Sequence, residues 1–404
     1  MNASERFEQY MQHLSDGLRH SDRHAGLRGY CTGLMLPLAR KSVEPMAASL
    51  DPLNASAKHQ ALHHFVAQAE WSDEEVLRRV AQWVVPRMEL DSGAYWIIDD
   101  TGYPKKGKHS VGVARQYCGQ LGKQDNCQVA VSISLATERA SLPVAYRLYL
   151  PKDWAGDRAR RKQAHVPAEI SFQTKPQIAL AQLEALLAQG APHHCVIADA
   201  GYGVDTQFRL RLTEIGLPYM LGITSAVSVW PEDVQPLPPK RYSGFGRPPV
   251  IPRRTSKRQP SSVKALAQSL PTRAFQNISW REGSNHTLSG RFAAVRVRHA
   301  GGNLGRARLW PQQWLLIEWP AAEPEPTKYW LSDVAPGNFA QRSGQRCPSA
   351  LAHRARLPGT EARARAKSLR RSWLARIPSP CHFNHRRVWL PPDRTTHHPL
   401  QPDQ

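Results

Sequence analysis

Three aspartates follow short apolar runs of the kind that form buried strands. Asp99 and Asp100 follow residues 95–98, and Asp199 follows residues 196–198. The last residue of a buried strand lies at the edge of the sheet, where loops form binding and catalytic sites. Carboxylates at the ends of neighbouring strands would therefore share a negatively charged pocket. Mg²⁺ or Mn²⁺ relieves such repulsion, and carboxylate oxygens are the ligands these ions prefer. Two such ions can activate a water and stabilise the leaving oxygen in phosphodiester cleavage.

A single aspartate in such a position is more often a turn or helix-cap residue than a metal ligand. The combination of two acidic strand ends with a very basic chain raises the weight of the metal interpretation. The sequence does not choose between Asp99 and Asp100, because residues 95–98 are apolar on both faces and show no alternation. Both aspartates therefore remain candidates at this point.

A lysine-rich segment follows the first acids. Lys105, Lys106 and Lys108 lie close enough in sequence to contact the scissile phosphate or its neighbours. The alternative is a solvated basic turn without a ligand.

A second basic segment has a different character. Residues 240–260 contain seven basic residues and no acid. Within it, Arg247 stands between Gly246 and Pro248, and a flat, extended arginine in that setting can enter a narrow, A·T-rich minor groove. We expect DNA contact from this segment, through Arg247, Arg253 and Arg254.

The composition narrows the class of protein. The chain has 404 residues, with 54 Lys and Arg against 33 Asp and Glu, which gives a net charge of +21 and suggests a polyanionic partner. The start has no signal-peptide pattern, and no run approaches the roughly 18 apolar residues of a membrane span. Six cysteines without a CxxC pair argue against disulfide scaffolds and cysteine zinc sites, and fit a reducing cytoplasm. The paired histidines lack companion ligands at metal spacing.

The predicted secondary structure around these residues changes along the chain, from helices to a mixture of strands and helices. Residues 1–90 show helical spacing and predict a helical domain, which either packs on the rest or binds DNA ends. From 91 to 228, the sequence predicts strands and helices in the order of a mixed sheet with flanking helices, an α/β (α+β) fold. The predicted strands cover 94–100, 127–136, 142–150, 195–200 and 218–224, and the helices 175–189 and 204–215.

The remaining chain divides into three parts. Residues 229–312 form a basic, Pro-rich insertion, and residues 313–335 return to strand texture at 314–319 and 329–334. Residues 336–404 hold 13 basic and 3 acidic residues, a charge of +10. Prolines interrupt this tail repeatedly, which predicts an irregular, poorly ordered segment.

At this point the residues resemble a family. Residues 95–136, 142–154 and the block Val196-Ile-Ala-Asp-Ala-Gly-Tyr-Gly203 look like insertion-sequence transposases of the DDE superfamily. The resemblance runs to about residue 334. It implies an RNase H-like catalytic core, two divalent ions (Mg²⁺ or Mn²⁺), and double-stranded transposon-end and target DNA as partners. The implied reaction is hydrolytic nicking followed by attack of the freed 3′-hydroxyl on target DNA.

The resemblance also assigns roles to residues. By position, the two catalytic, metal-binding acids match Asp100 and Asp199, with Asp99 and Tyr202 as supporting neighbours. It is compatible with a homo-oligomer on DNA and implies a bacterial protein of the cytoplasm and nucleoid, without a membrane.

The chain departs from the family at the third acid, a glutamate in a Trp-x-Ile-Glu-Arg-Asp-Tyr-like stretch. After residue 334 no such stretch exists. Synonymous codons for residues 353–361, read one base later, spell Ile-Glu-Arg-Asp-Tyr-Gln-Glu-Leu-Lys. We therefore hypothesise a frameshift near residues 335–345; a basic DNA-binding tail is the alternative. Four other glutamates are weak substitutes for the third acid: Glu318, Glu323, Glu325 and Glu361.

The sequence thus predicts a DDE-type transposase impaired in catalysis, because a two-metal site depends on its full geometry. Three rivals remain. The chain could be active through an unrecognised third acid. It could be a DNA-binding remnant that inhibits an intact relative. It could also be a generic metal-dependent nuclease without preference for transposon ends.

Overall fold

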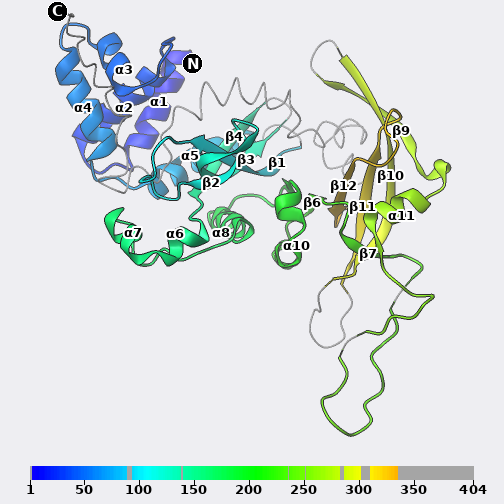
Figure 1. Ribbon diagram of the computed structural model, residues 1–404. Coiled ribbons are helices and arrows are strands. Elements are labelled where there is room, and N and C mark those ends of the chain that lie inside the picture. The colour runs from blue at the N-terminus through cyan, green and yellow to red at the C-terminus, as the bar shows by residue number, and fades with distance from the viewer. Residues whose placement is uncertain are drawn as a thin grey trace, which may run out of the picture.

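The computed structural model describes residues 2–334, apart from 89–92, 138–139, 235, 251, 283–285 and 302–309. The predicted tail, residues 336–404, lies outside the described residues. Figure 1 shows helices at one end of the molecule and a long sheet that runs to the other end. Among the described residues, no helix is both long and apolar enough to cross a membrane.

The N-terminal part is helical, as the spacing of its apolar residues predicts. Its core gathers one face of each helix, with Met46 and Leu62 almost completely buried. The last helix serves two cores, because Val84 and Val85 pack against the sheet instead. A Ser72 hydroxyl accepts the backbone N–H of Glu75 at the start of that helix (3.2 Å). The helices are α1 (Ala3–Ser15), α2 (Ser21–Met35), α3 (Val43–Leu50), α4 (Ala55–Ala67) and α5 (Asp73–Met88).

The first half of the sheet has the mixed pairing expected of an RNase H-like fold. β3 pairs antiparallel with β1 and β4, whereas β1, β5 and β6 run parallel to one another. β2 forms a short antiparallel hairpin with β3. The strands are β1 (Tyr95–Pro104), β2 (Ala114–Cys118), β3 (Lys123–Ala136), β4 (Ser141–Leu148), β5 (Cys195–Ala198) and β6 (Tyr219–Ile223).

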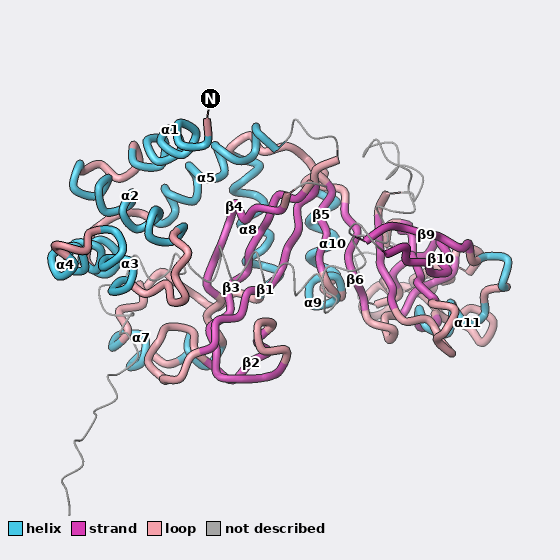
Figure 2. Tube along the Cα trace, turned by 90° about the horizontal axis from the view of Figure 1, so that it is seen from above, coloured by secondary structure: helices cyan, strands magenta, loops and turns pink. Residues whose placement is uncertain are grey.

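Helices cover this half of the sheet and begin at good caps. α8 (Lys175–Ala188) starts with a capping box between Thr174 and Gln177, and it buries Ile178 and Leu183 against the sheet. Figure 2 shows α8 beside β3 and β4, and α10 beside β5. The other helices of this region are α6 (Lys152–Gly156), α7 (Arg158–Gln163), α9 (Ala200–Gly203) and α10 (Thr206–Glu214).

The second half of the sheet continues the first without a break. β12 pairs antiparallel with β6, and β11, β10, β7 and β8 follow in that order, while β9 pairs with β10. Within the described part of the chain, the resulting sheet has 12 strands. The additional elements are β7 (Ser228–Pro231), β8 (Ser261–Ser262), α11 (Val263–Ser269), the 3₁₀ helix Thr272–Ala274, β9 (Gln276–Glu282), β10 (His286–His299), β11 (Gln312–Trp319) and β12 (Lys328–Ser332).

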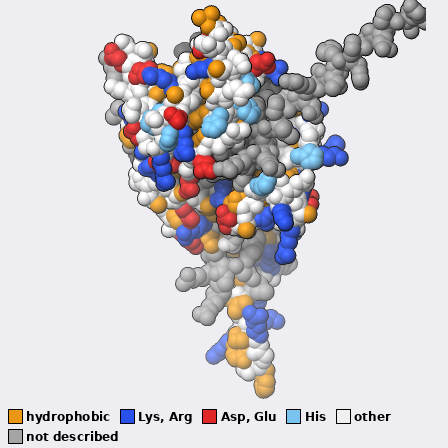
Figure 3. All heavy atoms as spheres, turned by 90° about the vertical axis from the view of Figure 1, so that its left-hand side faces the viewer, with side chains coloured by type: hydrophobic (Ala, Val, Ile, Leu, Met, Phe, Trp, Pro, Cys, Tyr) orange, Lys and Arg blue, Asp and Glu red, His pale blue; other side chains and the backbone are white. Residues whose placement is uncertain are grey.

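A long loop joins β7 to β8, and we call its residues 236–258 the basic loop. Its described part contains two isolated β-bridges and no regular element. In Figure 1 it extends far from the sheet. In Figure 3 it forms the lowest projection, on which basic and apolar side chains alternate. Phe245, near its tip, is 90% exposed.

Candidate active site

Asp99 and Asp100 lie in the middle of β1, so the expectation that they end their strand is wrong. β1 continues to Pro104, because residues Asp99 to Pro104 pair antiparallel with β3. On its other side, β1 pairs with β5 only from Tyr95 to Ile97. The acids therefore stand where β1 runs past the end of β5. The acids thus lie next to the open space beyond the last paired residue of β5, and not at the end of their own strand.

The structure resolves which aspartate faces the helices. Asp100 shares its face of β1 with Trp96 and Ile98, which are 1% and 3% exposed within the core under α8. Asp99 points to the opposite face, and its Oδ1 accepts the backbone N–H of Asp100 at 2.8 Å. The assignment of Asp100 as the site residue, with Asp99 as its neighbour, agrees with this orientation.

Both oxygens of the Asp100 carboxylate have protein donors. The Tyr202 hydroxyl donates to Oδ1 at 2.6 Å, and the Lys175 ammonium contacts Oδ2, also at 2.6 Å. Tyr202 is only 2% exposed, whereas about a third of the Asp100 and Lys175 side chains remains accessible (35% and 30%). Burial and the negative charge of Asp100 raise the pKa of Tyr202, so its hydroxyl stays protonated and remains a donor.

Asp199 caps α9 at the end of β5. Its Oδ1 accepts the backbone N–H of Gly201 at 2.8 Å. The surrounding protein displaces water from this carboxylate and raises its pKa, and the negative charges of Asp100 and Asp99 raise it further. The hydroxyl of Tyr202, which lies in the same short helix, donates to Asp100. The structure therefore places Asp100 beside the turn that begins at Asp199, and the role of the two acids as a joint site stays a prediction.

The two glycines beside Tyr202 have a packing reason. A Cβ on Gly203 would fall on the carbonyl oxygen of Gly222 in β6, so α9 approaches the sheet more closely than any other residue would allow. A Cβ on Gly201 would stand 3.1 Å from Asp199 Oδ1, the same oxygen that the Gly201 N–H holds. The block from Asp199 to Gly203 is therefore a compact turn that points Tyr202 at Asp100.

The donors at this position suit a hard divalent cation. They are carboxylate oxygens, the ligands that Mg²⁺ and Mn²⁺ prefer, and the pKa of Asp199 is raised first by burial and then by the negative charge of Asp100. However, among the described residues no group of three acidic, histidine or cysteine side chains is placed to hold a metal ion. In its described part the structure thus offers Asp100 and Asp199 as candidate ligands and no third.

The substitutes considered for the third acid have other neighbours. Glu318 lies in β11 and pairs with Lys328 at 3.3 Å, and Glu325 pairs with Lys264 at 2.5 Å. Glu323 lies in the turn between β11 and β12. Glu361 lies outside the described residues.

Comparison with known proteins agrees with this arrangement. The family described as DDE superfamily endonuclease matches residues 13–287, which include both Asp100 and Asp199. The chain belongs to this family. A protein of Microchaete diplosiphon, described as a probable transposase for insertion sequence element IS701, is 32% identical over 196 residues. The match covers 48% of this chain and 47% of that relative, so the chain matches about half of the relative's length.

The predicted lysines lie further from the acids than the sequence suggested. Because β1 extends to Pro104, Lys105 stands about 16 Å along the strand from Asp100, at about 3.3 Å per residue. The Asn126 side chain fixes this turn by donating to the carbonyl of Lys105 at 2.7 Å. Lys106 and Lys108 are exposed, whereas Lys105 is half-buried and burial lowers its pKa.

Sequence reasoning missed a basic helix beside these lysines. The Arg160 side chain donates to the carbonyl of Lys108 at 2.8 Å and lies 3.7 Å from the centre of the Trp154 ring. α7 thereby joins its Arg158, Arg160 and Lys162 to the same surface. The run Arg-Ala-Arg-Arg-Lys was visible in the sequence, but only the fold places it next to the lysine turn.

The three predicted arginines of the basic loop differ in how they are held. Arg247 is exposed at the tip, between two glycines of positive φ and two prolines. Arg253 pairs its backbone with Leu237, and its side chain donates to the carbonyl of Pro238 at 3.0 Å. Arg254 reaches the carbonyl of Ala300 at 3.5 Å. The structure brings none of them into contact with the acids.

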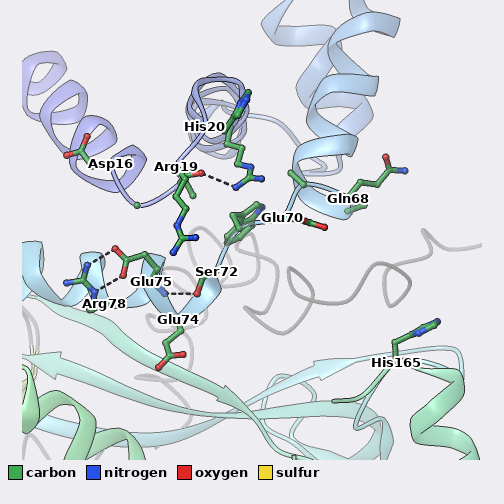
Figure 4. A pocket seen from close by; sticks show the side chains of 16 residues that line it. Asp16, Arg19, His20, Gln68, Glu70, Ser72, Glu74, Glu75, Arg78 and His165 are labelled. Atoms are coloured by element: carbon green, nitrogen blue, oxygen red, sulfur yellow. Dashed lines mark hydrogen bonds and ion pairs between the residues drawn. The ribbon is translucent and has the colours of Figure 1, made fainter. Parts of the chain in front are cut away.

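A separate cleft of about 1290 Å³ lies between the N-terminal helices and the core. Figure 4 shows its charged lining, in which Glu75 and Arg78 pair with each other and His165 faces the opening from the other side. Acidic and basic side chains are mixed around it, which does not suit a polyanion. None of the predicted site residues lines this cleft.

Proposed function

We propose that this DDE endonuclease acts on DNA as the transposase of an insertion sequence, cleaving and transferring strands at the transposon ends. The observation that carries the proposal is the hydrogen bond from Tyr202 to Asp100, which joins the first acid to the turn that begins at Asp199, where β1 runs past β5. The likeness to a probable insertion-sequence transposase supports the same reaction, although it covers about half of that relative.

In this proposal Asp100 and Asp199 hold Mg²⁺ or Mn²⁺. Such ions, when bound, activate water and stabilise the leaving oxygen of a phosphodiester. The protein's own part is to fix the ligands. Tyr202 orients Asp100 through its hydroxyl, and the Gly201 N–H orients Asp199, so both carboxylates are pre-set before DNA arrives.

DNA would be held by two separate basic surfaces. One is the turn of Lys105, Lys106 and Lys108 with helix α7, and it would contact phosphates next to the cleavage site. The other is the basic loop, where Arg247, Arg253 and Arg254 would contact a groove and its backbone. With DNA as the partner, the chain would act at the bacterial nucleoid, alone or as a homo-oligomer on the DNA.

We further propose that catalysis is impaired in this chain. Two carboxylates without a third leave a metal under-coordinated, and the hypothesised frameshift accounts for the loss of the glutamate from residues 336–404. The same observation favours a second candidate function. A chain that still binds transposon ends without cutting them would act as an inhibitor of an intact relative.

A paired assay on labelled transposon-end DNA tests both proposals. We expect a gel shift with specific DNA and little nicking in Mg²⁺ or Mn²⁺. Robust nicking that Asp100→Ala abolishes would show that the chain is an active enzyme through another third acid. Robust nicking that survives Asp100→Ala would reject the site itself. Equal binding of unrelated DNA, with unselective cutting, would point to a generic nuclease.

A further inference from the structure

The carboxylate pair already has a cation of its own. Lys175 Nζ lies 2.6 Å from Asp100 Oδ2, in the position where a divalent ion would have to bind that oxygen. Its positive charge also acts on Asp199, whose pKa it lowers against the stronger effects of burial and of Asp100. One ammonium therefore compensates charge on both candidate metal ligands.

Lys175 is presented to the acids by firm structure. It is the first residue of α8, where the capping box of Thr174 and Gln177 fixes the backbone. Its ammonium also lies 5.5 Å from the centre of the Tyr149 ring, a second attraction that a lysine free in water would lack. The backbone of Lys175 is thus fixed by the helix cap, and its ammonium is fixed by Asp100 and Tyr149, which favours one position of the side chain.

The two cations compete for one oxygen. Each oxygen of Asp100 accepts one protein donor, Tyr202 at Oδ1 and Lys175 at Oδ2, and only the donor at Oδ2 carries a positive charge. A divalent ion and an ammonium at this distance would repel each other, so they cannot share the position without movement of the lysine.

We propose that Lys175 is a resident counter-ion of the Asp100–Asp199 pair, that a divalent ion must displace it, and that the displaced ammonium then contacts a DNA phosphate. The inference rests on the proposed function, because it assumes that these acids bind metal. In this proposal, metal binding and release of Lys175 from Asp100 are one coupled event. Lys175 then helps to position the DNA through its contact with a phosphate.

The test compares Mn²⁺ binding by full-length variants, measured through the electron paramagnetic resonance signal of free Mn²⁺. Lys175→Met removes the competitor, so we expect Mn²⁺ to bind roughly tenfold more tightly, the usual effect of one adjacent charge on a carboxylate equilibrium. Lys175→Arg keeps the charge and should bind Mn²⁺ like the unaltered chain. Unchanged or weaker Mn²⁺ binding by a folded Lys175→Met variant would overturn the proposal.

Lys264→Met is the matched control. It removes a lysine of α11 with similar exposure, which is ion-paired at 2.5 Å with Glu325 in the turn between β11 and β12. It should leave the Mn²⁺ affinity unchanged. An equal gain with Lys264→Met would mean that overall charge, and not displacement at Asp100, caused the effect.

Thermal unfolding without metal gives a second readout. Lys175→Met leaves the carboxylates uncompensated and should lower Tm by roughly 2–4 °C. Asp100→Asn combined with Lys175→Met should recover most of that loss. Additive losses in the double variant would show that Lys175 merely packs against Tyr149, and would refute the counter-ion role.

The failure of this inference can be told from the failure of the proposed function. If neither the unaltered chain nor Lys175→Met binds Mn²⁺, the displacement idea is wrong. Binding of transposon-end DNA in metal-free buffer is read separately by gel shift, and it judges the DNA-related function on its own. Lys175→Met should also weaken that DNA binding only when Mn²⁺ is present, because only then is the lysine released.

Discussion

The acid site and the basic loop differ in how the protein holds their charged groups. Asp100 is gripped by Tyr202 and Lys175 through two contacts of 2.6 Å, whereas Arg247 stands exposed on a loop with no regular structure. Bond cleavage needs atoms at fixed positions, so its groups are set in advance by strands and helices. Capture of a polyanion needs charge and reach, and a loop that adapts to the DNA provides both.

Repair of the reading frame should produce the largest effect, because it acts on the rigid region. If a one-base shift near residues 335–345 is corrected, the returned glutamate should complete the site and raise nicking roughly 100-fold or more, the scale on which misplaced catalytic groups act. The measurement is strand cleavage of transposon-end DNA in Mg²⁺. Asp100→Ala in the repaired chain should return cleavage to the starting level. Codons incompatible with the shifted reading would end the frameshift hypothesis.

Neutralising the basic loop should have the next largest effect, on binding alone. The change of Arg247, Arg253 and Arg254 to Gln should lower DNA affinity and reduce the slope of log K against log salt by about 0.9 for each phosphate that the loop no longer neutralises. Tm should stay the same, because the loop contributes little to the core. Lys264→Gln provides a control for the removal of a positive charge outside the loop. An unaltered salt slope would remove the loop from the DNA interface.

A tyrosine in each region sharpens the comparison. Tyr202→Phe removes a buried hydrogen bond to a carboxylate and should cost about 1.5 kcal/mol in the free energy of unfolding. Tyr242→Phe removes an exposed bond to the carbonyl of Gly246 (3.1 Å) in the basic loop and should cost less than about 0.5 kcal/mol. Urea unfolding measures both. Equal costs would mean that the acid site is no more rigid than the loop.

The smallest expected effect is a gain of stability from Asp199→Asn in metal-free buffer. The folded-state pKa of Asp199 lies above its ordinary 3.8, so the folded chain holds this proton more strongly than the unfolded chain. Wild-type stability therefore falls as the pH rises from 3.8 through the raised pKa, and stays lower above it. Asn should give a rise in Tm at neutral pH, which stays modest because the Asp199 side chain keeps part of its contact with water beside the protein atoms that raise its pKa. The rise should vanish near pH 3.8, where the unfolded chain binds the proton too. A gain that persists in acid would contradict this cause.

The sequence was sufficient where local signals and packing agree. The apolar runs that became β3, β5 and β6 predicted strands, and the helical spacing from Lys175 onward predicted α8. The predicted strands placed acids at strand ends, and the family resemblance chose Asp100 and Asp199 among them. The role of these two residues remains a prediction. The division into domains remains a prediction.

The sequence was misleading where distant pairing overrides local propensity. Gly102 and Pro104 read as a turn, but pairing with β3 keeps these residues in β1, and a Cβ on Gly102 would meet Cys118 at 3.0 Å. The sequence did not predict β10, although the buried Ala293 and Val297 alternate with arginines as in a strand. The basic, Pro-rich composition of residues 229–312 indicated an insertion and outweighed this two-residue period. Lys175 could not be found, since its partner Asp100 lies 75 residues away in sequence.

The continuous sheet also fixes the distance between the acids and the start of the basic loop, and so the spacing of these two sites along bound DNA. From β1 the order runs through β5, β6, β12, β11 and β10 to β7, six steps in all. At about 4.8 Å per step these span about 29 Å, and the accumulated twist is about 120–150°. That distance matches eight or nine base pairs at about 3.4 Å each. A straight duplex centred on the acids would thus reach the start of the basic loop almost one helical turn away. Because the sheet twists between β1 and β7, the loop would contact a different side of the duplex. A footprint should therefore show two protected patches rather than one.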